Sequence, residues 1–288
     1  MADGPVAAAI APPAQIAALD ACAERRFTPS GEGRMVWRLW GRPEATPLVL
    51  MHGGYGSWMH WVRVIEPLAE RYYVIAPDTP GLGESASPPR PYSPDSIGAI
   101  VSQGLDEILP PPRRFHLTGF SFGAMCGSFV CLRQGARAIS FTMVGAAAMG
   151  LRRAPAEPLG KREVGMTEAE IAAQQRRNLE ILMIADPAKV DDQAVYIQTL
   201  NTEQARTQSR RFAATADLAR ALPGVKARLN AVWGDRDSSA YPYFAEREAF
   251  VRSLQPDAAF RLLSGVGHWA AYEGAAQFVP MLIELLER

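Results

Sequence analysis

The sequence is poor in the residues that mark disulfide-rich, metal-binding or nucleic-acid-binding proteins. Its 288 residues include three cysteines, too few for a disulfide framework. The four histidines, His52, His60, His116 and His268, show no pairing at metal-ligand spacing. Lys and Arg together number 30, as do Asp and Glu, so the formal net charge is zero and no basic stripe stands out. We therefore expect no metal and no nucleic-acid partner.

The sequence also lacks a membrane-spanning run and a secretion signal. Its longest uncharged run, residues 115–132, contains several glycines and hydroxyl residues, which favour a strand, a turn and a helix over a membrane span. The N-terminus carries Asp3 where a signal peptide has a basic region, and Pro12-Pro13 interrupts its apolar residues. We therefore expect a cytoplasmic protein without membrane association, in which residues 1–13 form a flexible tail.

The rest of the chain has the composition of a globular protein, with 48% hydrophobic and 21% charged residues. A short Ala-rich helix is expected around residues 15–25. Apolar runs bounded by turn residues predict strands at 35–40, 48–51, 72–76, 115–118, 139–144, 228–233 and 259–263. Segments with helical spacing separate most of these strands, which predicts an α/β fold whose parallel sheet has helices on both faces.

Residues 150–225 differ from the rest, because they contain no convincing strand and are helical in composition. We expect a helical insert there, between two strands of the sheet. It divides the core into a first part, residues 1–149, and a second part, residues 226–288.

One short motif offers a nucleophile. Gly119-Phe120-Ser121-Phe122-Gly123 has the pattern G-x-S-x-G and lies between a predicted strand and a helix-like segment, which is the context that this motif requires. The glycines allow a tight turn that exposes the serine hydroxyl, and the N-terminus of the following helix favours developing negative charge. A plain turn between strand and helix is the alternative interpretation of these residues.

A serine nucleophile needs a base, and the base needs an acid that orients it. His268 follows the last predicted strand among loop glycines and is the candidate base. Asp235 and Asp237 both follow the strand that ends at Gly234. We favour Asp237 as the acid, because Asp235 comes directly after the glycine and can stabilise the turn itself.

A glycine-rich loop, residues 52–56, follows the strand at 48–51 and can aim a backbone amide at a substrate. We expect the amides of Gly54 and Phe122 to bind a developing oxyanion. His52 and Asp78 are expected to stabilise their own loops rather than to act in catalysis.

Together these residues resemble the α/β-hydrolase family, in its capped branch. The matching motifs are H-G-G at 52–54, D-x-P-G-x-G-x-S at 78–85, G-x-S-x-G at 119–123, W-G-D-R-D at 233–237 and G-H-W at 267–269. The order Ser, Asp, His along the chain also agrees. The resemblance implies an eight-stranded, mostly parallel sheet with a helical cap at 150–225 after the sixth strand, and a triad of Ser121, Asp237 and His268.

The resemblance leaves two activities open. His268-Trp269-Ala270 followed by Glu273 is similar to carbon–carbon bond hydrolases of aromatic ring-fission products. A cap arginine binds the substrate carboxylate in those enzymes, and the candidates here are Arg206, Arg210 and Arg211. They usually carry Asn before the serine, whereas Phe120 is closer to the esterases and the cofactor-free haloperoxidase-like members.

We therefore expect a cofactor-independent serine hydrolase that cleaves a carboxylic ester or lactone through an acyl-enzyme. Cleavage of a 2-hydroxy-6-oxo-dienoate by the same triad is the alternative, and a non-catalytic binding protein is a third reading. The partner is a small molecule, bound near Trp58, Phe120 and Trp269 in a mostly apolar pocket. The oligomeric state stays open, with a homo-oligomer among the options.

Overall fold

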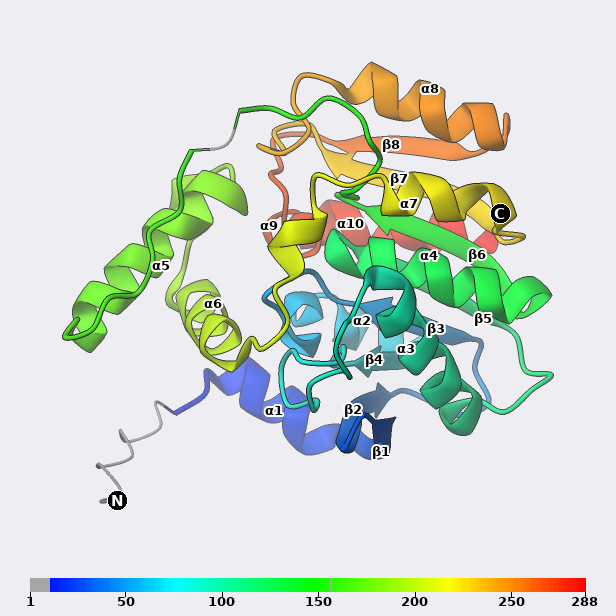
Figure 1. Ribbon diagram of the computed structural model, residues 1–288, viewed down its shortest axis with the longest axis horizontal. Helices are drawn as coiled ribbons and strands as arrows, with labels where there is room; N and C mark the ends of the chain where they lie inside the picture. Colours follow the sequence, from blue (N-terminus) through cyan, green and yellow to red (C-terminus); the bar gives the residue numbers. More distant parts are fainter. Residues whose placement is uncertain (1–10, 156) are drawn as a thin grey trace.

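The computed structural model describes residues 11–155 and 157–288, so most of the expected tail at 1–13 lies outside the described residues. An eight-stranded sheet with the order β1-β2-β4-β3-β5-β6-β7-β8 forms its centre (Figure 1). The strands are β1 (Glu24–Ser30), β2 (Gly33–Trp40), β3 (Pro47–Met51), β4 (Tyr73–Pro77), β5 (Phe115–Phe120), β6 (Ala138–Val144), β7 (Arg228–Gly234) and β8 (Ala259–Leu263). Only the β1–β2 and β2–β4 pairs are antiparallel, which confirms the mostly parallel sheet.

Helices cover both faces of the sheet, as expected. The helices are α1 (Ala14–Cys22), α2 (Ile65–Ala69), α3 (Pro94–Ile108), α4 (Phe122–Gln134), α5 (Glu168–Leu182), α6 (Asp192–Gln204), α7 (Asp217–Ala221), α8 (Phe244–Leu254), α9 (Ala270–Glu273) and α10 (Ala275–Glu287). One buried cluster packs α3, α4, α7 and α8 against the sheet. A second cluster packs α1, α2 and α10 against the opposite face.

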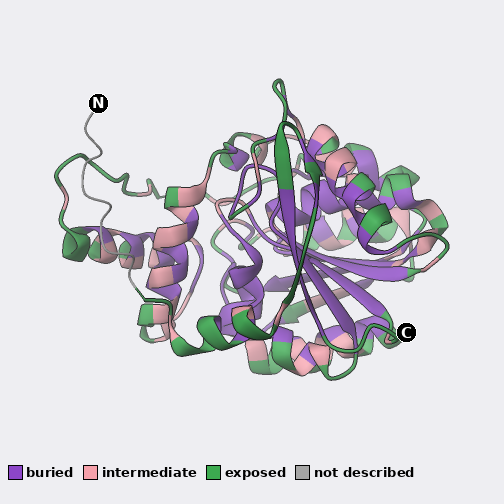
Figure 2. Cartoon of the chain, turned by 90° about the horizontal axis from the view of Figure 1, so that it is seen from below, coloured by how far each residue is buried: buried purple, intermediate pink, exposed green. Residues whose placement is uncertain are grey.

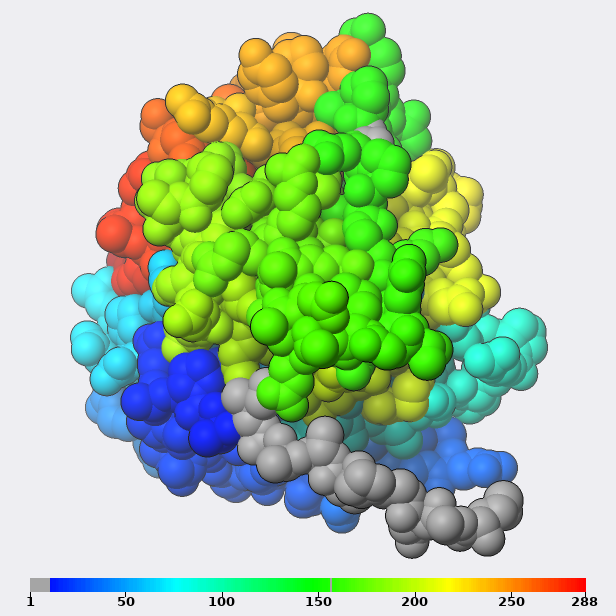
Figure 3. All heavy atoms as spheres, turned by 90° about the vertical axis from the view of Figure 1, so that its left-hand side faces the viewer, coloured from blue at the N-terminus to red at the C-terminus, as the bar shows by residue number. Residues whose placement is uncertain are grey.

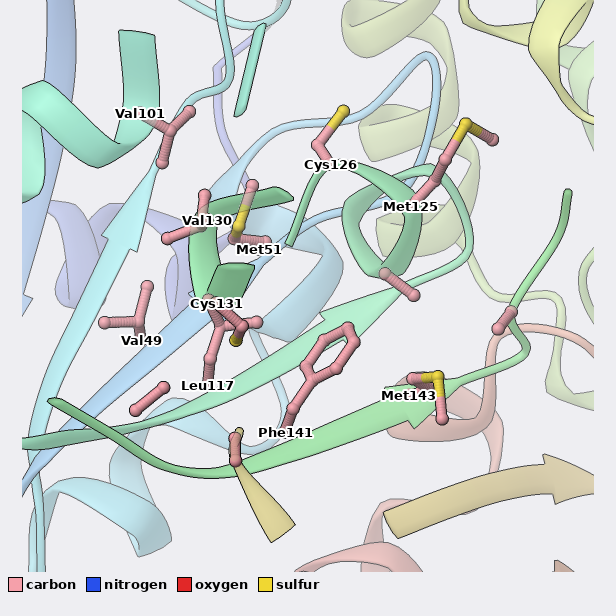
Figure 4. Packing of buried hydrophobic residues seen from close by; sticks show 14 of the residues in the cluster. Val49, Met51, Val101, Leu117, Met125, Cys126, Val130, Cys131, Phe141 and Met143 are labelled. Carbon is pink, nitrogen blue, oxygen red and sulfur yellow. The ribbon is translucent and has the colours of Figure 1, made fainter. Parts of the chain in front are cut away.

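The central strands are mainly apolar because both of their faces are buried; His116 and Thr118 of β5 are buried polar exceptions. Within β3, Val49 and Met51 join the first cluster, whereas Leu48 and Leu50 join the second. Figure 2 shows these strands as a buried layer, with exposed residues on the outer sides of the helices. Figure 4 shows the first cluster from close by, where side chains of α4 pack over those of β5 and β6.

The edge of the sheet differs from the expectation. The predicted helix at 15–25 ends at Cys22, and β1 begins at Glu24. Most residues of β1 are exposed, and the strand contains Pro29, so it lacks the apolar alternation that would reveal it. Its extended form depends on pairing with β2, a contact that a local pattern does not encode.

A helical segment connects β6 to β7, which is where an insert after the sixth strand was expected. Thr167 caps α5 in a capping box with Glu170, and Asp191 caps α6. These two helices pack together beside the sheet, and their residues lie in the middle of the face of the molecule seen in Figure 3. The range 150–225 stays a prediction for the insert, since α7 lies within it but packs against α4.

No helix among the described residues is long and apolar enough to cross a membrane.

Candidate active site

Ser121 lies on a strained turn between β5 and α4. Its backbone has φ 51° and ψ −109°, a conformation that residues with a side chain rarely adopt. Such a conformation costs about 1–3 kcal/mol and persists only where the surroundings enforce it. The Ser121 amide donates to the Val144 carbonyl of β6 at 2.8 Å, which holds the turn against the neighbouring strand.

The two motif glycines make room for this turn. A Cβ on Gly119 would lie 2.6 Å from the Gly123 carbonyl oxygen. A Cβ on Gly123 would overlap the carbonyl oxygens of Met51 and His52. The chain can therefore pass this closely only if both positions lack a side chain.

His268 and Asp237 form a buried pair at the same edge of the sheet. The His268 Nδ1–H donates to Asp237 Oδ2 at 2.8 Å, and the two side chains are 6% and 0% exposed. Asp237 Oδ1 also accepts hydrogen bonds from the amide and the hydroxyl of Ser239. Burial alone would raise the pKa of Asp237, but the charge of His268 and these hydrogen bonds lower it below its ordinary value. The carboxyl group is therefore ionised at neutral pH.

Asp235, the alternative acid, has a different role. Its carboxylate accepts the Gly265 amide at 2.8 Å and so connects the turn after β7 to the loop after β8. Asp237, not Asp235, contacts the histidine.

Two positions near the pair escaped the sequence analysis. Gly145, with φ 52°, follows β6, and a Cβ there would lie 3.1 Å from His268 Nδ1 and 3.4 Å from Asp237 Oδ2. Ser239 satisfies the second oxygen of Asp237. The available signals were a glycine directly after a strand and a hydroxyl residue two positions after the acid.

Glu273 anchors the loop that carries His268. Its buried carboxylate accepts the amides of Gly267 at 2.6 Å, Ala185 at 3.0 Å and Asp186 at 2.8 Å. Because two of these amides follow α5, one side chain joins the histidine loop to the insert. In the sequence, Glu273 stands out only through the resemblance to the carbon–carbon bond hydrolases.

The glycine-rich loop after β3 lies beside the turn that carries Ser121. A Cβ on Gly54 would lie 3.5 Å from the Phe122 Cβ, so the two expected oxyanion donors are neighbours. The Gly53 amide donates to His60 Nδ1 at 3.2 Å. Burial lowers the pKa of His60 well below its ordinary value, and the nearby His52 and His268 add to this effect. His60 is therefore a neutral acceptor that helps to hold the loop.

His52 and Asp78 stabilise the neighbouring loops. His52 Nε2 accepts the Thr79 amide at 2.9 Å. The Asp78 carboxylate accepts the amides of Trp58 at 2.9 Å and Glu84 at 3.1 Å. Both side chains are buried and satisfied by the backbone, as expected for structural residues.

A cavity of about 470 Å³ opens beside Ser121 and His268. Its volume is within the range typical of small-molecule sites. The core contributes Gly54, Phe120 and Phe122 to its wall, and the insert contributes apolar and amide side chains, namely Leu159, Asn178, Ile181, Leu182, Met183 and Gln198.

Of the three expected aromatic pocket residues, only Phe120 lines the cavity. Its ring centroid lies 4.9 Å from that of His268. The structure does not place Trp58 or Trp269 there. Trp58 packs against Trp40 at 5.5 Å between centroids, and the Trp269 Nε1–H donates to a backbone carbonyl at 2.7 Å. Both indoles belong to the buried cluster on the sheet, because burying them there removes more apolar surface from water.

The three candidate arginines have different positions. Arg206 donates to the carbonyls of Gly83 at 3.0 Å and Ser85 at 2.6 Å, outside the cavity wall. Arg211 donates to the Tyr92 carbonyl at 3.0 Å. These two guanidinium groups hold backbone turns rather than face a ligand.

Arg210 is the candidate that lines the cavity. Its guanidinium lies 4.4 Å from the ring centroid of Tyr55, in a cation–π contact. It makes no ion pair with the described residues. A cation in this position can bind an anionic group of a ligand. No group of three or more His, Cys, Asp or Glu within residues 11–155 and 157–288 is placed to hold a metal ion.

Comparisons with known proteins give consistent matches. The model of the alpha/beta hydrolase family matches residues 48–280. A 2-hydroxy-6-oxo-6-phenylhexa-2,4-dienoate hydrolase of Burkholderia cepacia is 24% identical over 259 residues, 85% of this chain and 88% of that protein. A 2-hydroxy-6-oxononadienedioate/2-hydroxy-6-oxononatrienedioate hydrolase of Escherichia coli K12 is 24% identical over 265 residues, 84% and 87% of the two chains.

Solved structures agree on the fold. A carboxylesterase of Bacillus subtilis superposes with a TM-score of 0.73 at 16% identity, covering 94% of each chain. At this identity, the match supports the fold and leaves the substrate open.

Proposed function

Because the chain belongs to the alpha/beta hydrolase family, we propose that it is a cofactor-independent serine hydrolase that cleaves a small carboxylic ester or lactone. The observation that carries the proposal is the convergence of three groups on one cavity. These are the strained Ser121, the His268–Asp237 pair and the neighbouring residues Gly54 and Phe122, whose amides are the expected donors. They correspond to a nucleophile, an oriented base and an oxyanion site.

In the first half of the reaction, the Ser121 hydroxyl attacks the carbonyl carbon. His268 Nε2 accepts the hydroxyl proton, because Nδ1 carries its own proton toward Asp237. The ionised Asp237 then stabilises the imidazolium. The carbonyl oxygen becomes an oxyanion held by the amides of Gly54 and Phe122. As the oxyanion collapses, the bond to the alcohol breaks, and the alcohol oxygen takes the proton from His268.

In the second half, water enters the place of the alcohol. His268 removes a proton from this water, and the resulting hydroxide attacks the acyl carbon. The second oxyanion collapses, the bond to Ser121 breaks, and the serine oxygen recovers its proton from His268. The structure shows no hydrogen bond between Ser121 and His268; such contacts often tighten when substrate binds.

The mostly apolar part of the cavity wall near the nucleophile favours ester cleavage. Phe120 directly precedes the nucleophile and lines the cavity, as do Leu182 and Met183. Such a wall suits the uncharged acyl or alkoxy group of an ester.

Turnover of short-chain p-nitrophenyl esters tests the proposal, with Ser121→Ala as the paired variant. We expect turnover by the native chain and loss of at least about 10³-fold in the variant, because the nucleophile is missing. Turnover that survives the substitution, or a native chain inactive on all such esters, would contradict it.

Carbon–carbon bond cleavage of a 2-hydroxy-6-oxo-dienoate is the second candidate, favoured by one observation. Arg210 faces the cavity without a carboxylate partner among the described residues, and such a substrate carries a carboxylate. The two curated relatives are named for substrates of this class.

Decay of the yellow absorbance of a ring-fission dienoate measures the second activity. If it is the physiological one, kcat/KM for the dienoate exceeds that for every neutral ester, and Arg210→Gln raises KM for the dienoate. Absence of decay at high enzyme concentration excludes it. Labelling by a fluorophosphonate separates both hydrolases from a non-catalytic binding protein.

A further inference from the structure

The cavity contains one buried hydroxyl that the proposed mechanism does not use. Ser209 is 2% exposed, lines the cavity, and its Oγ has no hydrogen-bond partner among the described residues. Native structures rarely leave a buried polar group unpaired, because its desolvation costs about 1–3 kcal/mol. The hydroxyl therefore requires an explanation, and a ligand atom in the cavity can supply its partner.

Ser209 lies directly beside the two expected oxyanion donors. It begins a 3₁₀ turn, Ser209–Phe212, between α6 and α7. A Cβ on Gly54 would overlap the Ser209 Oγ, lie 3.0 Å from the Ser209 Cβ, and lie 3.5 Å from the Phe122 Cβ. Gly54 thus lies between the Ser209 hydroxyl and Phe122, the residue that follows the nucleophile. Residues far apart in sequence meet here, where the connection after α6 crosses the glycine-rich loop.

The segment that carries Ser209 is fastened to the core. The Thr207 hydroxyl donates to the Pro80 carbonyl at 2.9 Å, and the Thr207 amide donates to the Gly81 carbonyl at 3.0 Å. The Gln208 amide donates to the Tyr92 hydroxyl at 3.1 Å. These bonds hold the backbone of the two residues that precede Ser209. A donor held in place in this way needs no rearrangement during the reaction, which is the condition for effective oxyanion stabilisation.

A ring–ring contact at the other end of the turn also holds it against the core. The Phe212 ring lies stacked on the Phe122 ring, with centroids 6.2 Å apart and planes 21° apart. Phe122 supplies one of the expected oxyanion amides. The turn is therefore packed directly against the residue that supplies one of the expected oxyanion amides.

We propose that the Ser209 hydroxyl is a third donor to the oxyanion, a catalytic residue supplied by the segment between β6 and β7. A carbonyl oxygen has two lone pairs, which the amides of Gly54 and Phe122 satisfy. The tetrahedral intermediate carries a full negative charge and a third lone pair, which Ser209 is placed to satisfy. The contact therefore strengthens as charge develops and raises kcat rather than substrate affinity. This inference rests on the proposed function.

Ser209→Ala is the primary test, measured with p-nitrophenyl butyrate. We expect kcat to fall by about 10²-fold, the effect of losing one oxyanion donor, with KM nearly unchanged. Ser209→Cys, a weaker donor of similar size, should give an intermediate rate. The melting temperature should not fall in Ser209→Ala, because the removed hydroxyl has no partner among residues 11–155 and 157–288.

Ser128→Ala is the matched control. Ser128 is also a fully buried serine, but it lies on α4 outside the cavity and donates to the Met125 carbonyl at 2.7 Å. Its removal should lower the melting temperature and leave kcat unchanged. Ser209→Ala should therefore lower kcat without lowering the melting temperature, whereas Ser128→Ala should do the reverse.

The inhibition constant of a trifluoromethyl ketone adds a measurement that would not change if Ser209 were only structural. The ketone forms a tetrahedral adduct with Ser121 that carries the oxyanion, so its Ki should rise in Ser209→Ala by the same factor as kcat/KM falls. Unchanged kcat, an unchanged Ki, or a loss of rate that accompanies a loss of stability would overturn the role of Ser209. A native chain that neither hydrolyses the ester nor binds the ketone would instead refute the proposed function.

Discussion

Three residues at the turn between β5 and α4 show how two missing side chains permit the candidate chemistry. Ser121 has a positive φ, and both flanking glycines are packed against backbone atoms. The exposed hydroxyl thus depends on Gly119 and Gly123 as much as on the serine itself.

Gly123→Ala tests this dependence. Its Cβ would overlap the backbone oxygens of Met51, at the end of β3, and of His52, so we expect the free energy of unfolding to fall by about 3 kcal/mol in urea denaturation. Gly135→Ala is the comparison, because Gly135 has a positive φ, 56°, which Gly123 lacks, whereas nothing lies within 4 Å of the added Cβ. That variant should lose only about 1–2 kcal/mol. Equal losses would mean that close packing at Gly123 is not the reason for the glycine.

The two aspartates after β7 provide a second test at the residue scale. Asp237→Asn leaves the geometry intact but removes the charge that orients His268, so kcat should fall by about 10⁴-fold. Asp235→Asn removes only an acceptor of the Gly265 amide, and we expect a loss below about 10-fold. Steady-state ester kinetics decide between them, and a larger loss in the second variant would reverse the assignment.

The sequence predicts the residues that belong to local motifs and misses those that act across distance. Ser121 and His268 each lie in a short pattern with its own strand and turn. Ser209 reaches the site through folding alone, and no neighbour in sequence reveals it. Gly145 and Glu273 have only weak signals, a glycine directly after a strand and a place in a family resemblance. Trp269 shows the converse, because a residue adjacent to the base can turn its side chain into the core.

At the scale of elements, α9 and the end of α5 determine how the base is held. Glu273 of α9 accepts one amide of the histidine loop and two amides after α5. The loop of His268 and the end of α5 are therefore held by the same Glu273 carboxylate. A displacement of the insert would act on His268 through this residue.

Glu273→Gln tests the anchor. Replacing one acceptor oxygen by an NH2 group leaves a buried amide unpaired, which should lower the free energy of unfolding by about 1–3 kcal/mol. Glu284→Gln is the control, since Glu284 pairs only with Arg261 on the surface and should change stability by less than about 1 kcal/mol. Denaturation curves of both variants give the comparison. Similar small changes would show that Glu273 is not an anchor.

The strands that the sequence predicts are mainly apolar runs bounded by turn residues, and most of them are largely buried in the sheet. β1 escapes because it is an edge strand that one partner stabilises. The position of the insert could be predicted from the absence of strands. The packing of α7 against α4 could not be predicted, because nothing in the sequence of this short helix indicates which element it contacts.

At the scale of the whole molecule, core and insert enclose one cavity of about 470 Å³ around Ser121. A cavity of this size should limit the substrate. We expect kcat/KM for p-nitrophenyl esters to be highest at short or medium acyl length and to fall by more than about 10²-fold at palmitate, which exceeds the enclosed space. A series from acetate to palmitate measures this dependence. Undiminished activity on palmitate would show that the cavity does not confine the acyl chain.

The central claim is that Ser121 is the nucleophile of a working serine hydrolase. Mass spectrometry after treatment with a fluorophosphonate tests it most directly. We predict one adduct per native chain, on the peptide that contains Ser121, and no adduct in Ser121→Ala with the fold retained by circular dichroism. A folded native chain that resists the reagent, or equal labelling of the Ser121→Ala variant, would contradict the account.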